Sequence, residues 1–161
     1  MRICYILTAI PGSGKTTWAM NFKSTHLNTF IVSSDEIRKE LGGSYQYFKE
    51  EDRVWRIFFA RANKFARENK DCHVILDSTC ITDYYRELYL NKVKGFDKVC
   101  LVYFKVPFAE CRKRNKNRRI EKQVPDGPFD NLLRQFKEPS DFIIEMFDEY
   151  IIVTNWRVDK W

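Results

Sequence analysis

The sequence lacks several features that would assign it to well-defined classes. No apolar run is long enough to cross a bilayer, which excludes a membrane-spanning helix. The cysteines are odd in number and form no CxxC pair, so neither a disulfide framework nor a cysteine-based zinc site is expected. Only two histidines are present, and they are isolated from each other and from other ligands. We expect His26 and His73 to be structural.

The composition is that of a globular protein. With 161 residues, of which 44% are hydrophobic and 31% charged, the chain can bury a core of its own, and we expect one domain over residues 1–161. The first residues run into an apolar segment without a signal-peptide cleavage pattern, so we expect a cytoplasmic protein. We expect the cysteines to be reduced packing residues: Cys4, Cys72, Cys80, Cys100 and Cys111.

The most informative segment is residues 9–16, AIPGSGKT, which follow an apolar run and lead into a segment with helical spacing of apolar residues. This is a phosphate-binding loop in its strand-loop-helix context. Ala9 stands where the usual pattern has glycine, and alanine is acceptable there if its φ is negative. The loop predicts binding of ATP and Mg²⁺, with Lys15 on the β and γ phosphates and the Thr16 hydroxyl on the metal. The residues expected to bind nucleotide are Gly12, Ser13, Gly14, Lys15, Thr16 and Thr17.

Strand and helix patterns alternate along the chain. We expect strands at residues 3–7, 29–33, 73–77, 98–104 and 149–154, and helices after the phosphate loop and at 34–41, 50–70, 83–93, 108–118 and 129–137. Near-continuous apolar strands favour a sheet buried on both faces. The sequence therefore predicts a three-layer α/β sandwich of the P-loop NTPase type, with a mostly parallel sheet of about five strands and a helical lid at about residues 107–137.

The segment 50–70 has the clearest amphipathic pattern. Its apolar residues recur at spacings of three and four, as they do on one face of a helix. We expect its aromatic side chains to belong to the core and not to form a stacking surface.

Several polar residues follow the predicted strands, where ligands bind in such sheets. Asp35 follows the second strand and is the candidate general base that deprotonates an acceptor hydroxyl, although Ser34 or Asp35 could also cap the next helix. Arg38 lies one helical turn further and can hold a substrate phosphate, or can be an ordinary surface arginine. Asp77 ends the third strand and could serve Mg²⁺, orient Arg38 or position the acceptor.

A basic run follows the fourth strand. Six of the eight residues from 112 to 119 are Arg or Lys. Such a run can be a solvated helix face, or it can close over ATP or hold a polyanion. Arg114 and Arg118 are four residues apart and can point to one side, as lid arginines that stabilise transferred charge would require.

These residues resemble the kinase domain of the bacteriophage 5′-hydroxyl polynucleotide kinases. The resemblance depends on residues 11–19, Asp35 with Arg38, the acid at Asp77, and residues 106–118. It implies that Lys15 and Thr16 bind ATP and Mg²⁺, that Asp35 is the base, and that Arg38 contacts a 3′ phosphate of the acceptor. It also implies that Asp77 positions the acceptor and that Arg118, with Arg114, belongs to the lid. Thr79 stands where the phage enzymes have asparagine.

The leading hypothesis is an ATP-dependent kinase of 5′-hydroxyl ends of DNA or RNA. The alternatives are a kinase of a small acceptor such as a nucleoside, nucleotide or antibiotic, and a nucleotide-dependent switch. An acceptor-side base argues against the switch. The tail residues Trp156 and Trp161 could pack on the domain or join subunits in a homo-oligomer.

Overall fold

A sheet of five parallel strands forms the centre of the computed structural model, which describes residues 1–154. Its spatial order is β2-β3-β1-β4-β5, and every neighbouring pair is parallel. The strands are β1 (Arg2–Thr8), β2 (Thr29–Ser33), β3 (Cys72–Asp77), β4 (Lys98–Phe104) and β5 (Glu149–Val153). Parallel strands need crossover connections, which place helices on both faces of the sheet. The predicted parallel α/β sandwich is confirmed.

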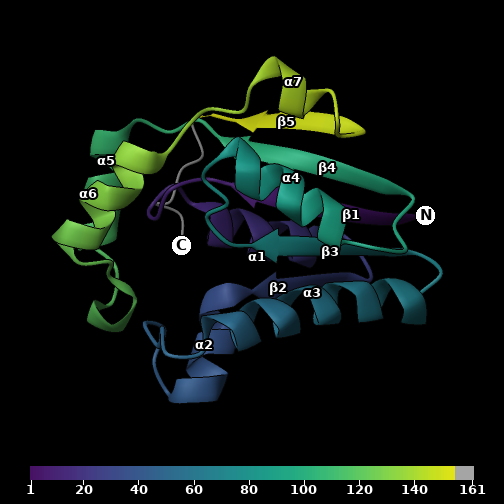
Figure 1. Ribbon diagram of the computed structural model, residues 1–161, viewed down its shortest axis with the longest axis horizontal. Helices are drawn as coiled ribbons and strands as arrows, with labels where there is room; N and C mark the ends of the chain where they lie inside the picture. The colour runs from purple at the N-terminus through teal and green to yellow at the C-terminus, as the bar shows by residue number, and fades with distance from the viewer. Residues whose placement is uncertain (155–161) are drawn as a thin grey trace.

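Helices cover the two faces of the sheet, and others extend beyond its edge (Figure 1). They are α1 (Lys15–Thr25), α2 (Ser34–Gly42), α3 (Glu51–Glu68), α4 (Asp83–Lys92), α5 (Phe108–Lys116), α6 (Asp126–Gln135) and α7 (Asp141–Ile144), with a short 3-10 helix at Ile120–Lys122. The segment 107–137, which contains α5, the 3-10 helix and α6, is called the lid below.

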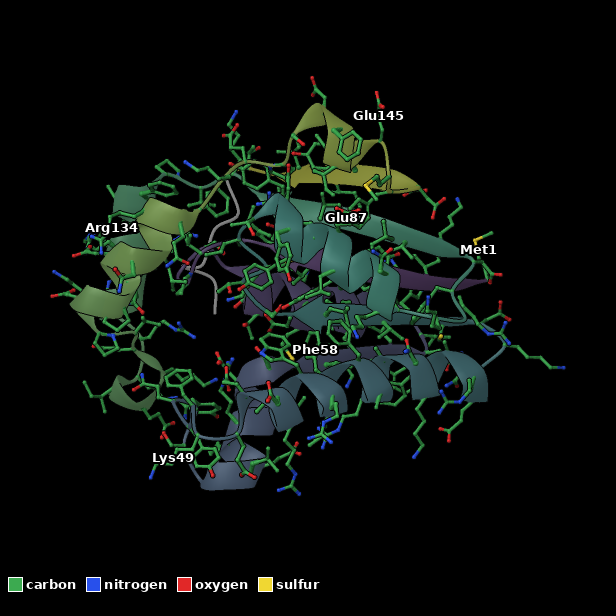
Figure 2. All side chains as sticks on the ribbon, in the orientation of Figure 1. Met1, Lys49, Phe58, Glu87, Arg134 and Glu145 are labelled. Atoms are coloured by element: carbon green, nitrogen blue, oxygen red, sulfur yellow. The ribbon has the colours of Figure 1, made fainter. Side chains whose placement is uncertain are left out.

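The alternation of side chains along β1 supplies both layers of the core. Cys4 and Ile6 pack in the cluster that α3 and α4 cover, whereas Tyr5 and Leu7 pack in the cluster that α1 covers. Phe58 points from α3 toward the sheet and is fully buried (Figure 2). Burial on both faces explains why the strands read as continuous apolar runs.

Some boundaries differ from the sequence prediction. Helix α6 begins at Asp126, three residues earlier than expected, and α5 ends at Lys116. Pro128 does not break α6, because it lies in the first turn, where backbone N–H groups have no partner within the helix. The short helices at Ile120–Lys122 and Asp141–Ile144 were not predicted.

All five cysteines are free and buried, as expected of packing residues. No helix of residues 1–154 combines the length and apolar character that a bilayer span needs. Trp156 and Trp161 lie outside the described residues.

A fully buried arginine joins the end of β1 to α4 and to the last residue of the lid. Arg86 donates from Nε to Thr8 Oγ1 at 3.0 Å, from Nη1 to Asp83 Oδ1 at 2.8 Å, and from Nη2 to the carbonyl oxygen of Lys137. Removing one member of such a network leaves buried polar groups without partners.

We therefore expect Arg86→Met to lower the free energy of unfolding by about 2–4 kcal/mol. Urea denaturation measures this change. Arg53→Met is the matched control, because Arg53 is exposed and pairs with Glu50 one turn away on the surface. Similar losses in the two variants would contradict the structural role of Arg86.

Candidate functional site

The loop between β1 and α1 curls at two glycines. Gly12 has φ +84° and Gly14, which precedes α1, has φ +93°, a region that residues with a Cβ rarely occupy. Ala9 is not among the described non-glycine residues with positive φ, so alanine is accommodated where the usual loop has glycine. The loop therefore has the backbone conformation that its glycine spacing requires.

The lid packs directly against this loop. A Cβ built on Gly12 would lie only 2.2 Å from the backbone oxygen of Cys111 in α5, so glycine is required for the close approach. Arg114 donates from Nη1 to the Ser13 carbonyl oxygen at 3.2 Å and pairs with Glu110 at 3.1 Å. Arg114 thus joins α5 to the phosphate loop.

The loop residues fit a bound nucleoside triphosphate. Lys15 begins α1 and is only 9% exposed, and Thr16 and Thr17 follow it in the first turn. Ser13 Oγ is buried and has no hydrogen-bond partner among residues 1–154. A buried hydroxyl without a partner, next to a helix N-terminus and a lysine, is suited to an incoming phosphate oxygen.

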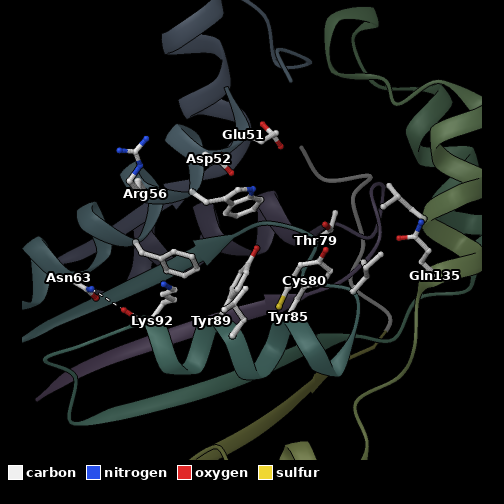
Figure 3. A pocket seen from close by; sticks show the side chains of 15 residues that line it. Glu51, Asp52, Arg56, Asn63, Thr79, Cys80, Tyr85, Tyr89, Lys92 and Gln135 are labelled. Atoms are coloured by element: carbon white, nitrogen blue, oxygen red, sulfur yellow. Dashed lines mark hydrogen bonds between the residues drawn. The ribbon is translucent and has the colours of Figure 1, made fainter. Parts of the chain in front are cut away.

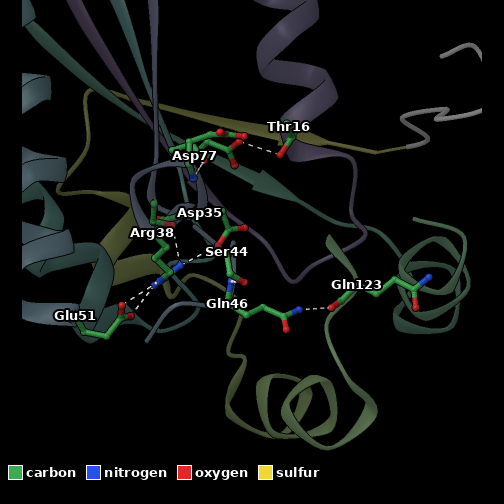
Figure 4. A network of polar contacts seen from close by, with 12 residues as sticks. Thr16, Asp35, Arg38, Ser44, Gln46, Glu51, Asp77 and Gln123 are labelled. Atoms are coloured by element: carbon green, nitrogen blue, oxygen red, sulfur yellow. Dashed lines mark hydrogen bonds and ion pairs between the residues drawn. The ribbon is translucent and has the colours of Figure 1, made fainter. Parts of the chain in front are cut away.

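Thr16 and Asp77 meet at the carboxyl end of the sheet. Thr16 Oγ1 donates to Asp77 Oδ2 at 2.9 Å, and Asp77 is buried (Figure 4). Burial raises the pKa of Asp77, while the charge of Lys15 and the bond from Thr16 oppose that shift. A hydroxyl and a carboxylate are oxygen ligands of the kind that Mg²⁺ prefers, and Mg²⁺ commonly takes only one or two from the protein. The pair therefore fits that metal.

Asp35 projects from the first turn of α2. The helix is capped by Ser33, whose side chain accepts a hydrogen bond from the backbone N–H of Glu36. The expectation that Ser34 or Asp35 caps α2 is therefore wrong, since the cap is one residue earlier. The Asp35 carboxylate is 55% exposed and accepts from Arg38 Nη1 at 2.9 Å. It is available to a substrate and has a cation beside it.

Glu51, at the start of α3, holds the other side of Arg38. Arg38 donates from Nε and Nη2 to the two carboxylate oxygens of Glu51, at 3.0 and 2.7 Å. Burial of Arg38 disfavours its charge, but the bonds to Glu51 and Asp35 outweigh this effect and raise the pKa of Arg38. Arg38 is thus a fixed, buried cation and not an ordinary surface arginine. The sequence did not indicate Glu51 as the partner of Arg38, because the two residues lie on different helices separated by a loop.

Arg118, in the lid, lies close enough to Asp35 and Asp77 for their charges to act on it. Burial lowers the pKa of Arg118, and the negative charges of Asp35 and Asp77 oppose this shift. Its side chain makes no hydrogen bond or ion pair with another residue in the described part of the chain. By contrast, Arg112 is engaged with Asp130 at 2.5 Å. The structure therefore brings Lys15, Asp35, Arg38, Asp77 and Arg118 to one end of the sheet.

The lid also touches the loop between α2 and α3. Gln46 donates from Nε2 to the carbonyl oxygen of Gln123 (Figure 4), and the Lys122 ammonium lies 5.1 Å from the centre of the Tyr45 ring. These contacts join the lid to the segment between α2 and α3.

A family model described as "AAA domain" matches residues 6–139. No curated protein matches the chain significantly. Kti12 of Chaetomium thermophilum, solved with ADP-AlF3, is similar at a TM-score of 0.70 and 18% identity, over 94% of this chain and 89% of that chain.

Two further solved structures show the range of relatives. A chain of the Pnkp1/Rnl/Hen1 RNA repair complex has a TM-score of 0.70 and 22% identity, over 91% of this chain but only 46% of that chain. A gluconokinase from Sinorhizobium meliloti 1021 has a TM-score of 0.61 and 15% identity, over 98% of this chain and 85% of that chain. At these identities the likeness shows the fold. Because the family model covers most of the chain, the protein belongs to the AAA domain family, with a P-loop kinase-like fold.

Proposed function

We propose that the protein is an ATP-dependent kinase that transfers the γ-phosphate to the 5′-hydroxyl end of a polynucleotide. The observation that supports this most strongly is the meeting of the phosphate loop with the Asp35 and Arg38 pair at one end of the sheet. The phosphate loop provides the donor site, and the pair of Asp35 and Arg38 provides the acceptor site. Phosphoryl transfer requires the donor phosphate and the acceptor hydroxyl to be in line. It also requires compensation of the negative charge on the phosphoryl group that moves.

On the donor side, the loop N–H groups and Lys15 hold the triphosphate, and Ser13 Oγ donates to a phosphate oxygen. Thr16 and Asp77 would hold Mg²⁺, which supplies positive charge to the β and γ phosphates when bound. Arg114 reaches the loop from the lid, and Arg118 lies near Asp35 and Asp77. Arg118 is the better placed to compensate charge on the transferred group, because its guanidinium has no partner among the described side chains.

On the acceptor side, Asp35 accepts the proton of the attacking hydroxyl. The hydroxyl oxygen forms a bond to the γ phosphorus, the bond from that phosphorus to the bridging β–γ oxygen breaks, and ADP leaves. Arg38 lies next to Asp35 and offers a cation to a phosphate on the acceptor.

The formal net charge of +6 suits an acceptor with several phosphates. The likeness to a chain of an RNA repair complex is in keeping with such a substrate.

A kinase of a small acceptor is the second candidate. Arg38 is already paired with both Asp35 and Glu51, so its charge is largely compensated. This arrangement suits an acceptor without a phosphate at that position. The likeness to a gluconokinase favours the same alternative.

Transfer of labelled γ-phosphate from Mg-ATP separates the two candidates. The acceptors are 5′-hydroxyl DNA and RNA oligonucleotides, 3′-nucleotides, free nucleosides and gluconate. Labelling of oligonucleotide ends above all other acceptors would support the polynucleotide function and show the preference between DNA and RNA. Labelling of monomers alone would favour the small-acceptor function.

The role of Arg38 gives a sharper prediction. Arg38→Ala should raise KM for an acceptor with a 3′ phosphate by about 10–100-fold, the effect of one charge-assisted hydrogen bond, with a much smaller change for the plain nucleoside. Steady-state kinetics on the two acceptors measure the difference. Arg61→Ala is the control, since Arg61 forms an exposed pair with Glu40 away from the site. Equal changes on both acceptors would contradict the phosphate contact.

A further inference from the structure

A groove with a volume of about 760 Å³ lies between α3 and α4, outside the residues assigned above to phosphoryl transfer (Figure 3). Its walls include the aromatic side chains Trp55, Phe59, Tyr85 and Tyr89. Trp55 and Phe59 pack against the core, as predicted, but they also line this groove. We propose that the groove binds the nucleobase of the acceptor's 5′-terminal nucleotide, an inference that rests on the proposed function.

The groove begins where the acceptor hydroxyl would be. Glu51 lines it and also holds Arg38, which contacts the proposed base Asp35. Thr79 lines it as well and lies two residues after Asp77. Gln135 of α6 contributes from the lid side. A nucleotide with its 5′ oxygen at Asp35 can therefore direct its base between α3 and α4.

The side chains of the groove suit a planar ring better than a polyanion. Tyr89 packs against Phe59 at 5.1 Å and against Trp55 at 5.8 Å between ring centres, and Tyr85 is 45% exposed. Stacking of a base on such a ring strengthens binding and tolerates any base. The charged groups are balanced and do not form a track for phosphates: Glu51, Asp52, Arg56 and Lys92.

A strained turn fixes the groove to the phosphate loop. Cys80, which lines the groove, has φ +47°, an uncommon conformation for a residue with a Cβ. Thr8 Oγ1 donates to the Cys80 carbonyl oxygen at 2.6 Å, and the Ala9 N–H donates to that of Thr79 at 2.9 Å. Strain of this kind persists where the surrounding structure imposes it and is concentrated at ligand sites. The turn that lines the groove is thereby bonded directly to the start of the phosphate loop.

Tyr85→Ala tests the proposal, with Tyr84→Ala as the matched control. Tyr84 is the neighbouring residue, 71% exposed, and does not line the groove. The acceptors are a 5′-hydroxyl oligonucleotide with an intact 5′-terminal nucleotide and the same oligonucleotide with an abasic 5′-terminal residue. Tyr85→Ala should raise KM about 10-fold for the intact acceptor and less than about twofold for the abasic one, and Tyr85→Phe should restore the wild-type value. Tyr84→Ala should leave both values unchanged.

Binding without transfer distinguishes the failure of this inference from that of the proposed function. Fluorescence anisotropy measures the affinity for a 5′-deoxy oligonucleotide, which cannot accept phosphate, and for its abasic counterpart. Transfer to polynucleotides with equal KM effects of Tyr85→Ala on both acceptors would overturn the groove assignment and leave the kinase function intact. Base-dependent binding that Tyr85→Ala abolishes, without transfer to any polynucleotide, would overturn the proposed function and support the groove. Neither transfer nor base-dependent binding would overturn both.

Discussion

Replacement of Asp35 by asparagine is expected to lower kcat by about 10²–10⁴-fold while leaving ATP affinity nearly unchanged. Asparagine has almost the same shape as aspartate but cannot accept the hydroxyl proton. Asp35 is exposed at the start of α2, and its helix is capped by Ser33, so the substitution removes no cap. Single-turnover transfer with saturating Mg-ATP measures the effect on the chemical step.

Two controls isolate the role of Asp35 as the base. Glu36→Gln neutralises the next carboxylate on α2 and should leave kcat within about twofold, because only the Glu36 backbone N–H takes part in the cap. The melting temperature of Asp35→Asn shows whether loss of the pair with Arg38 disturbs the fold. Near-normal turnover in a stable Asp35→Asn variant would remove Asp35 as the base.

Replacement of Lys15 by alanine is expected to abolish turnover, a loss on the order of 10³-fold or more. Lys15 begins α1 directly after the phosphate loop and is mostly buried. Its charge acts on the β and γ phosphates, so affinity for ATP should fall more than affinity for AMP. Calorimetric titration with the two nucleotides measures this difference.

Lys23→Ala provides the comparison for Lys15→Ala. Lys23 lies in the last turn of the same helix, is exposed, and should be replaceable without loss of turnover. Retained turnover in Lys15→Ala, or an equal loss of affinity for ATP and AMP, would show that the loop does not hold the triphosphate in the proposed way.

The sequence alone indicated the loop, the strands and the order of the elements. These depend on local rules. Glycines must stand where the backbone curls, as at Gly12 and Gly14, and strands buried on both faces must be apolar throughout. Asp35 and Asp77 could be singled out for the same reason, because they follow strands whose carboxyl ends share one edge of a parallel sheet.

Helix boundaries were harder to predict where the same residue type can stand at more than one position near the end of a helix. Proline usually ends a helix, yet Pro128 lies in the first turn of α6, where its missing N–H costs nothing. Ser33, Ser34 and Asp35 can all cap a helix, and the sequence offered no means of choosing among them. The choice of Ser33 depends on where the chain leaves β2.

The tertiary structure alone decided which distant side chains meet. Glu51 binds Arg38 from another helix, and Arg86 donates a hydrogen bond to Thr8, 78 residues away in the sequence. The backbone oxygen of Cys111 lies so close to Gly12 that a Cβ there would clash. The tertiary structure also placed Trp55 and Phe59 at the edge of a groove as well as against the core. Local sequence determines the conformations that a segment can adopt, because torsional sterics and backbone hydrogen bonds act over a few residues. Partners such as Glu51 and Arg38 depend on how helices dock on the sheet, which is set by the packing of the whole core.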